Sequence, residues 1–471
     1  MTQKTQKNVP IRLFNTDGRT KEVFKPIKEG YVGMYCCGPT VYNFAHIGNL
    51  RAYIFDDILR RMFEYNNYDV KQVVNITDVG HLTSDADEGE DKMLKGAKRE
   101  KKTVWEIAKF YEEAFFKDLK SLNILEPNIK PRATEHIKEM IELVKKLEEN
   151  GYTYSTEGNI YYDISKFKDY GKMARLKMDD LEAGARIDVD ENKRNPHDFV
   201  LWFTHSKFGN QEMQWDSPWG RGFPGWHVEC SAMSMKYLGE KFDIHCGGID
   251  HIPVHHTNEI AQSEGATGKK WVNYWLHNDF LVLNKGKMAK SGESFITLQV
   301  LRDKGFDPMD YRFFCLGAHY RTQLNFSYEA MDGARNAFKK LKERVLELKS
   351  NPCSFPKPTL EAKYKTKFLE SINNDINTSE ALALVNAVLK DKELGNDEKL
   401  SLIFDFDRVL GLDLNKLEQD NIPEEIKVLA QKRQEARDNK DWTTSDKIRD
   451  NLKEKGYTID DSPEGQKIKK L

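Results

Sequence analysis

The sequence predicts an α/β protein in which an open parallel sheet, interrupted by an insertion, is followed by an all-α C-terminal region. Residues 30–38 ("GYVGMYCCG") alternate small and apolar side chains and predict a buried strand; an amphipathic helix and a strand at 69–79 follow, completing a βαβ unit. A second strand–helix set begins at residue 242. After about residue 326 the strand signals fade, and leucine, alanine and lysine recur with helical periodicity. Ligands of such Rossmann-type sheets bind where strands turn into helices.

The segments between these sets predict helices and an inserted unit. Charged sequences at about 92–122 and 132–150 have helical spacing. Residues 151–225 mix turn sequences such as "SPWGRGFPG" with a polar run, and therefore predict an insertion within the sheet domain. The proline-containing stretch 349–363 predicts a loop.

The composition excludes several classes of protein. With 471 residues, the chain is long enough for about three domains. Its net charge of −2 means that any nucleic-acid partner must be bound by local patches such as "KKLKER" (339–344), which could equally be solvated helix faces. We see no secretion signal and no run of 18 uncharged apolar residues, so we expect a cytoplasmic protein without a membrane span.

The six cysteines are sparse, and no CxxC pair occurs among them. This pattern favours a reducing compartment over a disulfide framework, and any metal site must collect single ligands from distant segments. Within "HHTNE", His255 and Glu259 are four residues apart on a predicted helix, so both project from one face, whereas His256 lies about 100° away and is not expected to join them. Nitrogen and carboxylate ligands at this spacing suit zinc, with Cys37 and Cys230 as candidate partners. The spacing alone is also compatible with a satisfied polar pair.

Two further short motifs suggest a phosphate site. His46, Gly48 and Asn49 lie where the first strand turns into its helix, and the backbone N–H groups of a helix start favour an anion. Far downstream, "KGKMAKSGE" (285–293) places lysines on a glycine-containing loop, where they could neutralise a triphosphate. Each motif alone could be incidental, but their order at the two ends of one nucleotide domain strengthens the interpretation.

Taken together, the blocks resemble the cysteinyl-tRNA synthetases, which are class I aminoacyl-tRNA synthetases. "YCCGPTVYNFAHIGN" (35–49) is similar to the family's first signature, and "KMAKS" (287–291) is similar to KMSKS. The blocks at 184–202, 215–234 and 245–264 follow the family's central motifs, and 373–383 and 436–465 resemble its C-terminal half. Asn49 and Ala289 depart from the histidine and serine of the two signatures; asparagine can still donate to a phosphate.

The resemblance implies a division of the chain. Its catalytic domain would comprise residues 1–120 and 226–275, separated by a connective insertion at 121–225. A stem-contact region with the KMAKS loop would follow at 276–325. A helical anticodon-binding bundle at 326–415 and a small anticodon-binding region at 416–471 would complete the chain.

The resemblance also implies the site residues. One zinc ion per chain would be held by Cys37, Cys230, His255 and Glu259. Cys36 would point to the opposite face of its strand as a small buried side chain. We also hypothesise that Cys246 is a free, accessible thiol near the active site. ATP, with Mg²⁺, would be bound by His46, Gly48, Asn49, Asp250, Lys287 and Lys290. The catalytic residues would be His46, Asn49, Lys287 and Lys290. Substrate cysteine would contact Gly38, Thr40, Thr77 and Trp226, although Trp226 could equally be a core residue.

The implied reaction joins L-cysteine to tRNA(Cys) through cysteinyl-adenylate. Serine is slightly smaller than cysteine, so a pocket cannot exclude it by shape, whereas zinc binds the substrate thiolate selectively. We therefore expect no editing domain, and we expect a monomer. Two alternatives remain: a cysteine ligase of mycothiol-type cofactor synthesis, and a non-catalytic, zinc-stabilised RNA-binding protein.

Overall fold

A four-stranded parallel sheet forms the centre of the protein. The computed structural model describes residues 9–80, 92–176, 192–205, 212–283, 295–418, 423–462 and 465–470. The central sheet has the strand order β10-β9-β3-β4, and all its neighbours are parallel. Its strands are β3 (Tyr31–Cys36), β4 (Asp69–Val74), β9 (Phe242–Gly248) and β10 (Val272–Asn278).

The strand order reverses between β3 and β9. The chain passes from β3 through α1 (Ile47–Tyr65) to β4 on one side, and later adds β9 and β10 on the other side of β3. In open α/β sheets the carboxyl ends of the strands at such a reversal leave a crevice for a ligand. The helices that precede and follow β9 are α6 (Trp226–Leu238) and α7 (His255–Thr267).

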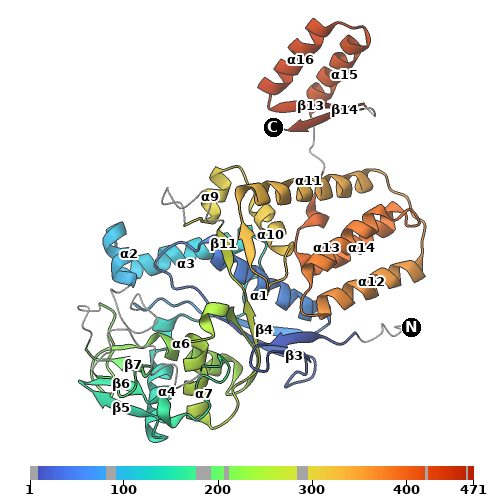
Figure 1. Ribbon diagram of the computed structural model, residues 1–471. Coiled ribbons are helices and arrows are strands. Elements are labelled where there is room, and N and C mark those ends of the chain that lie inside the picture. The colour runs from blue at the N-terminus through green and yellow to red at the C-terminus, as the bar shows by residue number, and fades with distance from the viewer. Residues whose placement is uncertain are drawn as a thin grey trace.

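The insertion carries its own antiparallel sheet, which Figure 1 shows at the lower left. Helices precede this sheet, and its strands have the order β5-β6-β7-β8. The helices are α2 (Lys92–Glu100), α3 (Val104–Ser121) and α4 (Ile137–Glu149), and the strands are β5 (Thr153–Thr156), β6 (Asn159–Tyr162), β7 (Phe199–Phe203) and β8 (Phe223–Pro224). The helical stretch expected at 92–122 is thus two helices, because Thr103 begins a new one by capping Glu106 N–H.

The second half of the chain is mainly helical. Two short parallel strands, a pair of small helices and a helical bundle follow β10 (Figure 1). These elements are β11 (Leu281–Leu283), α9 (Leu298–Asp303), α10 (Pro308–Leu316), β12 (Leu324–Phe326), α11 (Tyr328–Ser350), α12 (Pro358–Asn373), α13 (Thr378–Lys390) and α14 (Asn396–Leu410). An antiparallel hairpin near the amino terminus, β1 (Arg12–Asn15) and β2 (Thr20–Val23), packs beside β10.

A small unit at the C-terminal end lies beyond α11 in Figure 1. It contains α15 (Glu424–Asp438), α16 (Trp442–Glu454) and the antiparallel strands β13 (Tyr457–Ser462) and β14 (Gly465–Lys470). The predicted fold class is confirmed, but the expectation of helices alone after residue 326 is wrong at this hairpin. The apolar residues Tyr457, Ile459 and Ile468 of this hairpin pack on the two helices. Tyr457 and Ile459 are two residues apart, as is typical of a strand, but the charged residues around them obscured this pattern in the sequence.

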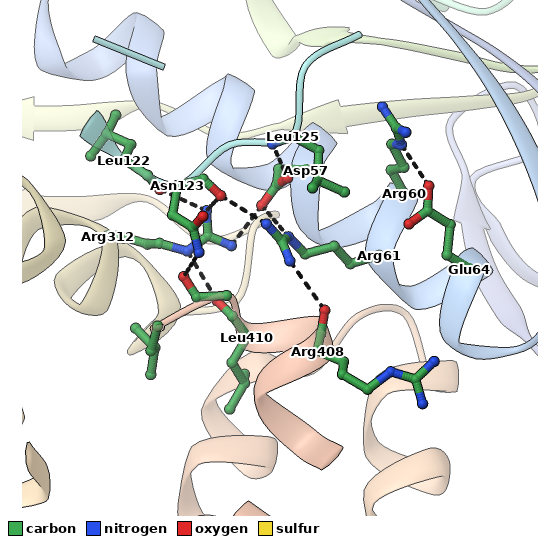
Figure 2. A network of polar contacts seen from close by, with 12 residues as sticks. Asp57, Arg60, Arg61, Glu64, Leu122, Asn123, Leu125, Arg312, Arg408 and Leu410 are labelled. Carbon is green, nitrogen blue, oxygen red and sulfur yellow. Dashed lines mark hydrogen bonds and ion pairs between the residues drawn. The ribbon is translucent and has the colours of Figure 1, made fainter. Parts of the chain in front are cut away.

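A buried ion pair joins α1 to the helical half of the chain. Figure 2 shows Asp57 of α1 between two arginines: Arg312 Nη2 lies 2.6 Å and Arg61 Nε 2.8 Å from Asp57 Oδ2. Arg312 also donates to the carbonyl oxygens of Leu122 and Leu410, each at 2.9 Å. The side chains of Asp57 and Arg312 are fully buried, so each depends on the other for neutralisation.

None of the helices in the described ranges combines the length and the apolar character that crossing a bilayer requires.

We predict that Arg312→Met lowers the free energy of unfolding by about 3–5 kcal/mol, because it leaves a buried carboxylate short of its closest cation. Urea denaturation measures this change. The matched control is Arg335→Met, which breaks an exposed pair with Asp332 and should cost under about 1 kcal/mol. Equal effects of the two substitutions would contradict a special role for the buried pair.

Candidate active site

A cavity of about 490 Å³ opens at the carboxyl ends of β3 and β9, where the strand order reverses. The loop after β3, the first turns of α1 and the residues after β9 and β10 line it. Most of the predicted site residues lie in its wall, namely Cys37, Gly38, Thr40, His46, Gly48, Asn49, Thr77, Trp226, Cys230 and Asp250.

The start of α1 is fixed by reciprocal capping between two signature residues. Asn49 N–H donates to His46 Nδ1 at 3.1 Å, and His46 N–H donates to Asn49 Oδ1 at 3.2 Å. Asparagine at position 49 therefore acts as a capping residue, and His46 Nε2 and Asn49 Nδ2 remain for a ligand. Burial lowers the pKa of His46, so its imidazole is neutral at pH 7.

The first turn of α1 keeps one backbone donor available. Ile47 N–H donates to Ile296 O and Leu50 N–H to His46 O, while Asn49 N–H is used by the cap. Within the described ranges, Gly48 N–H alone of these four donors has no acceptor. A free donor at the positive end of a helix, in the wall of a cavity, suits an anionic group.

The loop after β3 is pressed against the residues that follow β4. Gly38 N–H donates to Asn75 Oδ1 at 2.8 Å, and a Cβ atom on Gly38 would lie 1.5 Å from Asn75 O. Val41 N–H donates to Thr77 O, and Thr77 Oγ1 donates to Glu229 Oε2 at 3.1 Å. This close approach brings three of the four predicted substrate residues, Gly38, Thr40 and Thr77, to one side of the cavity.

Four groups that can bind a metal converge behind this loop. Cys37, His255, His256 and Glu259 each offer one donor atom, and these atoms all lie within 4.8 Å of one another. His255 Nε2 is 3.6 Å from Glu259 Oε2, and Cys37 Sγ is 3.3 Å from His256 Nε2. Cys230 is not one of these four, but its thiol lies close enough to Cys37 to act on it, and both cysteines line the cavity.

The expectation that His256 lies apart from this group is wrong. It is three residues before Glu259, so it neighbours Glu259 on the helix surface as His255 does, and its Nε2 is 3.7 Å from Glu259 Oε2. His256 Nδ1 hydrogen-bonds to His277 Nε2 at 2.7 Å, and His277 Nδ1 to Thr16 Oγ1 at 2.7 Å. The sequence analysis missed this chain of contacts, although the high density of histidines at 227–256 signalled it.

The electrostatics of the group fit a cation. Glu259 is fully buried, and among the described residues its Oε2 has no hydrogen-bond donor. Burial raises the pKa of Glu259 and of the Cys37 thiol well above their ordinary values, and it lowers the pKa of His245, which faces Glu259, to about 3. An orphaned carboxylate beside two thiols and neutral imidazoles is the donor set that zinc binds.

The remaining predicted residues divide into two groups. The Trp226 ring stacks on His255 with 4.4 Å between centroids and also lines the cavity, so it contacts both the metal group and the ligand space. Lys287 and Lys290 lie outside the described residues. The segment that contains them begins after β11 and ends before Phe295, and Leu281 and Phe295 both line the cavity.

Comparisons with known proteins agree with this geometry. The model of the class I (C) tRNA synthetase catalytic domain matches residues 23–336, and the model of the cysteinyl-tRNA ligase anticodon-binding domain matches residues 419–468. A cysteine–tRNA ligase of Treponema denticola is 52% identical, covering 98% of this chain and all of the relative. One from Burkholderia lata is 47% identical, covering 98% of this chain and 97% of the relative.

A solved structure with much lower sequence identity has a similar fold. Methionyl-tRNA synthetase of Mycobacterium tuberculosis, in complex with methionyl-adenylate, superposes with a TM-score of 0.54 at 15% identity. The match covers 81% of this chain and 90% of the other. At this identity the likeness establishes the fold and nothing more.

We predict that Gly38→Ala lowers the free energy of unfolding by about 2 kcal/mol or more, because the new methyl group overlaps a backbone oxygen. Chemical denaturation measures it against Gly333→Ala in α11, where nothing lies within 4 Å of the added carbon. The control should gain about 0.5–1 kcal/mol from helix propensity. A Gly38→Ala variant as stable as the wild type would show that the loop can move away from Asn75.

Proposed function

The chain belongs to the cysteinyl-tRNA synthetase family of class I aminoacyl-tRNA synthetases, and from this premise we propose that it activates L-cysteine with ATP and transfers it to the 3′ end of tRNA(Cys). The observation that carries the proposal is that a zinc-type donor set reaches the cavity through Cys37, while a capped helix start lines the same cavity.

The reaction has two steps. The cysteine carboxylate attacks the α-phosphate of magnesium-bound ATP, forming cysteinyl-adenylate and releasing pyrophosphate. A hydroxyl of the terminal tRNA ribose then attacks the adenylate carbonyl, and AMP leaves. The protein supplies mainly position and charge stabilisation for both steps.

The phosphate side of the cavity is assigned to the start of α1. Gly48 N–H, His46 Nε2 and Asn49 Nδ2 are the donors that capping leaves available, and they would bind phosphate oxygens. Lys287 and Lys290 would stabilise the charge that develops on the leaving pyrophosphate, and Asp250 would hold the ribose or the substrate amine.

The amino-acid side is assigned to the loop after β3 and to the metal group. Gly38, Thr40 and Thr77 would contact cysteine, and Trp226 would close the pocket next to His255. Cys37, Cys230, His255 and Glu259 would hold one zinc ion. When bound, zinc provides a thiophilic centre that favours the substrate thiolate over the hydroxyl of serine. The buried carboxylate and thiols need such a cation, which supports the assignment.

The rest of the chain would engage the tRNA. Residues 276–325 would contact its stem, and residues 326–415 and 416–471 would bind its anticodon. The match of the second family model to 419–468 supports the last of these assignments.

We predict that pyrophosphate exchange into ATP depends on cysteine and on zinc. Serine should support exchange roughly 10⁴-fold less well, because the discrimination rests on a bond that serine cannot make well. Removal of metal with a chelator should abolish cysteine-dependent exchange, and added zinc should restore it. Exchange that survives complete metal removal would contradict the zinc assignment but not the proposed reaction. No exchange by folded, metal-loaded protein would favour a non-catalytic RNA-binding role.

A second prediction tests whether Cys230 or His256 completes the set of zinc ligands. Cys230→Ser should lose one equivalent of zinc, whereas His256→Asn should retain it, because the proposed ligand set contains Cys230 and not His256. Metal analysis of the purified variants measures this difference. Loss of zinc from His256→Asn with retention by Cys230→Ser would instead identify His256 as the ligand.

A further inference from the structure

A second group of metal-binding side chains lies on the opposite face of β3 from Cys37. Cys36 and Cys246 are direct partners in the register of the parallel strands β3 and β9, and Asp56 of α1 covers them. One donor atom of each residue lies within 4.8 Å of the other two. Both cysteines are fully buried, and Asp56 is 5% exposed. The predicted orientation of Cys36 is confirmed, whereas the expected accessibility of Cys246 is wrong.

The Asp56 carboxyl lacks the partners that a buried acid normally has. The polar groups closest to it are the two thiols, which are weak donors, and no cationic side chain in the described ranges forms an ion pair with it. The nearest charged group that acts on it is a second carboxylate, Asp57, which is itself neutralised by Arg312 and Arg61. A buried carboxylate is normally paired with a cation or coordinated to a metal.

We propose that Cys36, Cys246 and Asp56 form a second metal site, which takes a thiophilic divalent ion of the zinc class. Its ligands are the two sulfur atoms and one carboxylate oxygen. β3 separates it from the first group, because consecutive residues of a strand project to opposite faces. The inference therefore does not depend on which residues hold the first ion.

The spacing of the three atoms suits such an ion. Zinc–sulfur bonds of about 2.3 Å place neighbouring tetrahedral ligands roughly 3.8 Å apart, so donor atoms within 4.8 Å need to move by no more than about 1 Å. Gln72 Nε2 donates to Cys36 Sγ at 3.6 Å and can stabilise a thiolate there. Three protein ligands leave the fourth position of zinc for water.

The cavity provides a route to this site. Asp56 lines the cavity together with Tyr53 and Asn49, which lie one and two turns earlier on α1. An ion or a water molecule can therefore reach the carboxylate from the active-site side. Once bound, the ion would join β3, β9 and α1 immediately behind Cys37 and Gly247, and so would stabilise the wall of the pocket.

Metal analysis of the full-length protein tests the proposal. After zinc loading and removal of free metal, the wild type should retain two ions per chain, and Cys36→Ala and Cys246→Ala should each retain one. Cys315→Ala is the matched control, because Cys315 is equally enclosed but contacts Tyr311 instead of either site; it should retain two. Cys230→Ser, which affects the first site, should retain one.

Cobalt substitution gives a second, spectroscopic readout. The thiolate-to-cobalt charge-transfer absorption of the wild type should be about twice that of Cys246→Ala, and Asp56→Asn should weaken cobalt retention at the second site while leaving the first occupied. One retained ion in the wild type that survives Cys36→Ala and Cys246→Ala would overturn the proposal.

Two further outcomes are distinguishable. A wild-type protein that shows two fewer free thiols in denaturant, with a disulfide joining Cys36 to Cys246, would replace the metal site by a redox pair and overturn the proposal. If Cys230→Ser retains as many ions as the wild type while Cys246→Ala loses one, the second site stands and the zinc assignment of the proposed function fails.

Discussion

The position of α1 is the constraint on which the rest of the molecule depends, and buried arginines fix it. Arg312 neutralises Asp57 near the middle of the helix and ties it to the carbonyl groups of the bundle (Figure 2). Two turns earlier, Arg51 donates to Phe280 O and Thr322 O at 2.6 Å, and so connects α1 to the strands around the predicted lysine loop. Because a buried charge is costly when unpaired, these contacts permit little displacement of the helix. The capped turn at His46 begins the same helix, so its position is fixed as well.

Because side chains alternate along β3, the adjacent residues Cys36 and Cys37 lie in two different chemical environments. Cys37 faces the core formed with α6 and α7, whereas Cys36 faces the core formed with α1. Both cores contain a buried carboxylate, Glu259 on one side and Asp56 on the other. Burial raises the pKa of Glu259 well above its usual range and that of Asp56 to about 7, because water no longer stabilises their charges. A cation on either side would reverse that effect.

The sequence sufficed for the fold class and for many of the residues that line the cavity. Period-two alternation predicted β3, and the helical spacing of His255 and Glu259 placed them on one face, because both inferences depend only on local geometry. The prediction for His256 was wrong because the angular position of a residue on a helix does not account for the length of its side chain. It also does not account for the neighbour His277, which belongs to β10 and hydrogen-bonds to His256. The pairing of Cys36 with Cys246 could not be predicted, because register between strands 200 residues apart is set by tertiary packing.

The arrangement also explains how four residues so distant in sequence come together. Cys37 directly follows β3, Cys230 lies on the helix before β9, and His255 and Glu259 lie on the helix after it, so the reversal of strand order brings all four to one end of the sheet. Helices hold Cys230, His255 and Glu259, and Cys37 N–H donates to Cys246 O at 3.2 Å, which fixes the donor atoms more precisely than a free loop would. The proposed discrimination between a thiol and a hydroxyl would need that precision, because cysteine and serine differ in one atom.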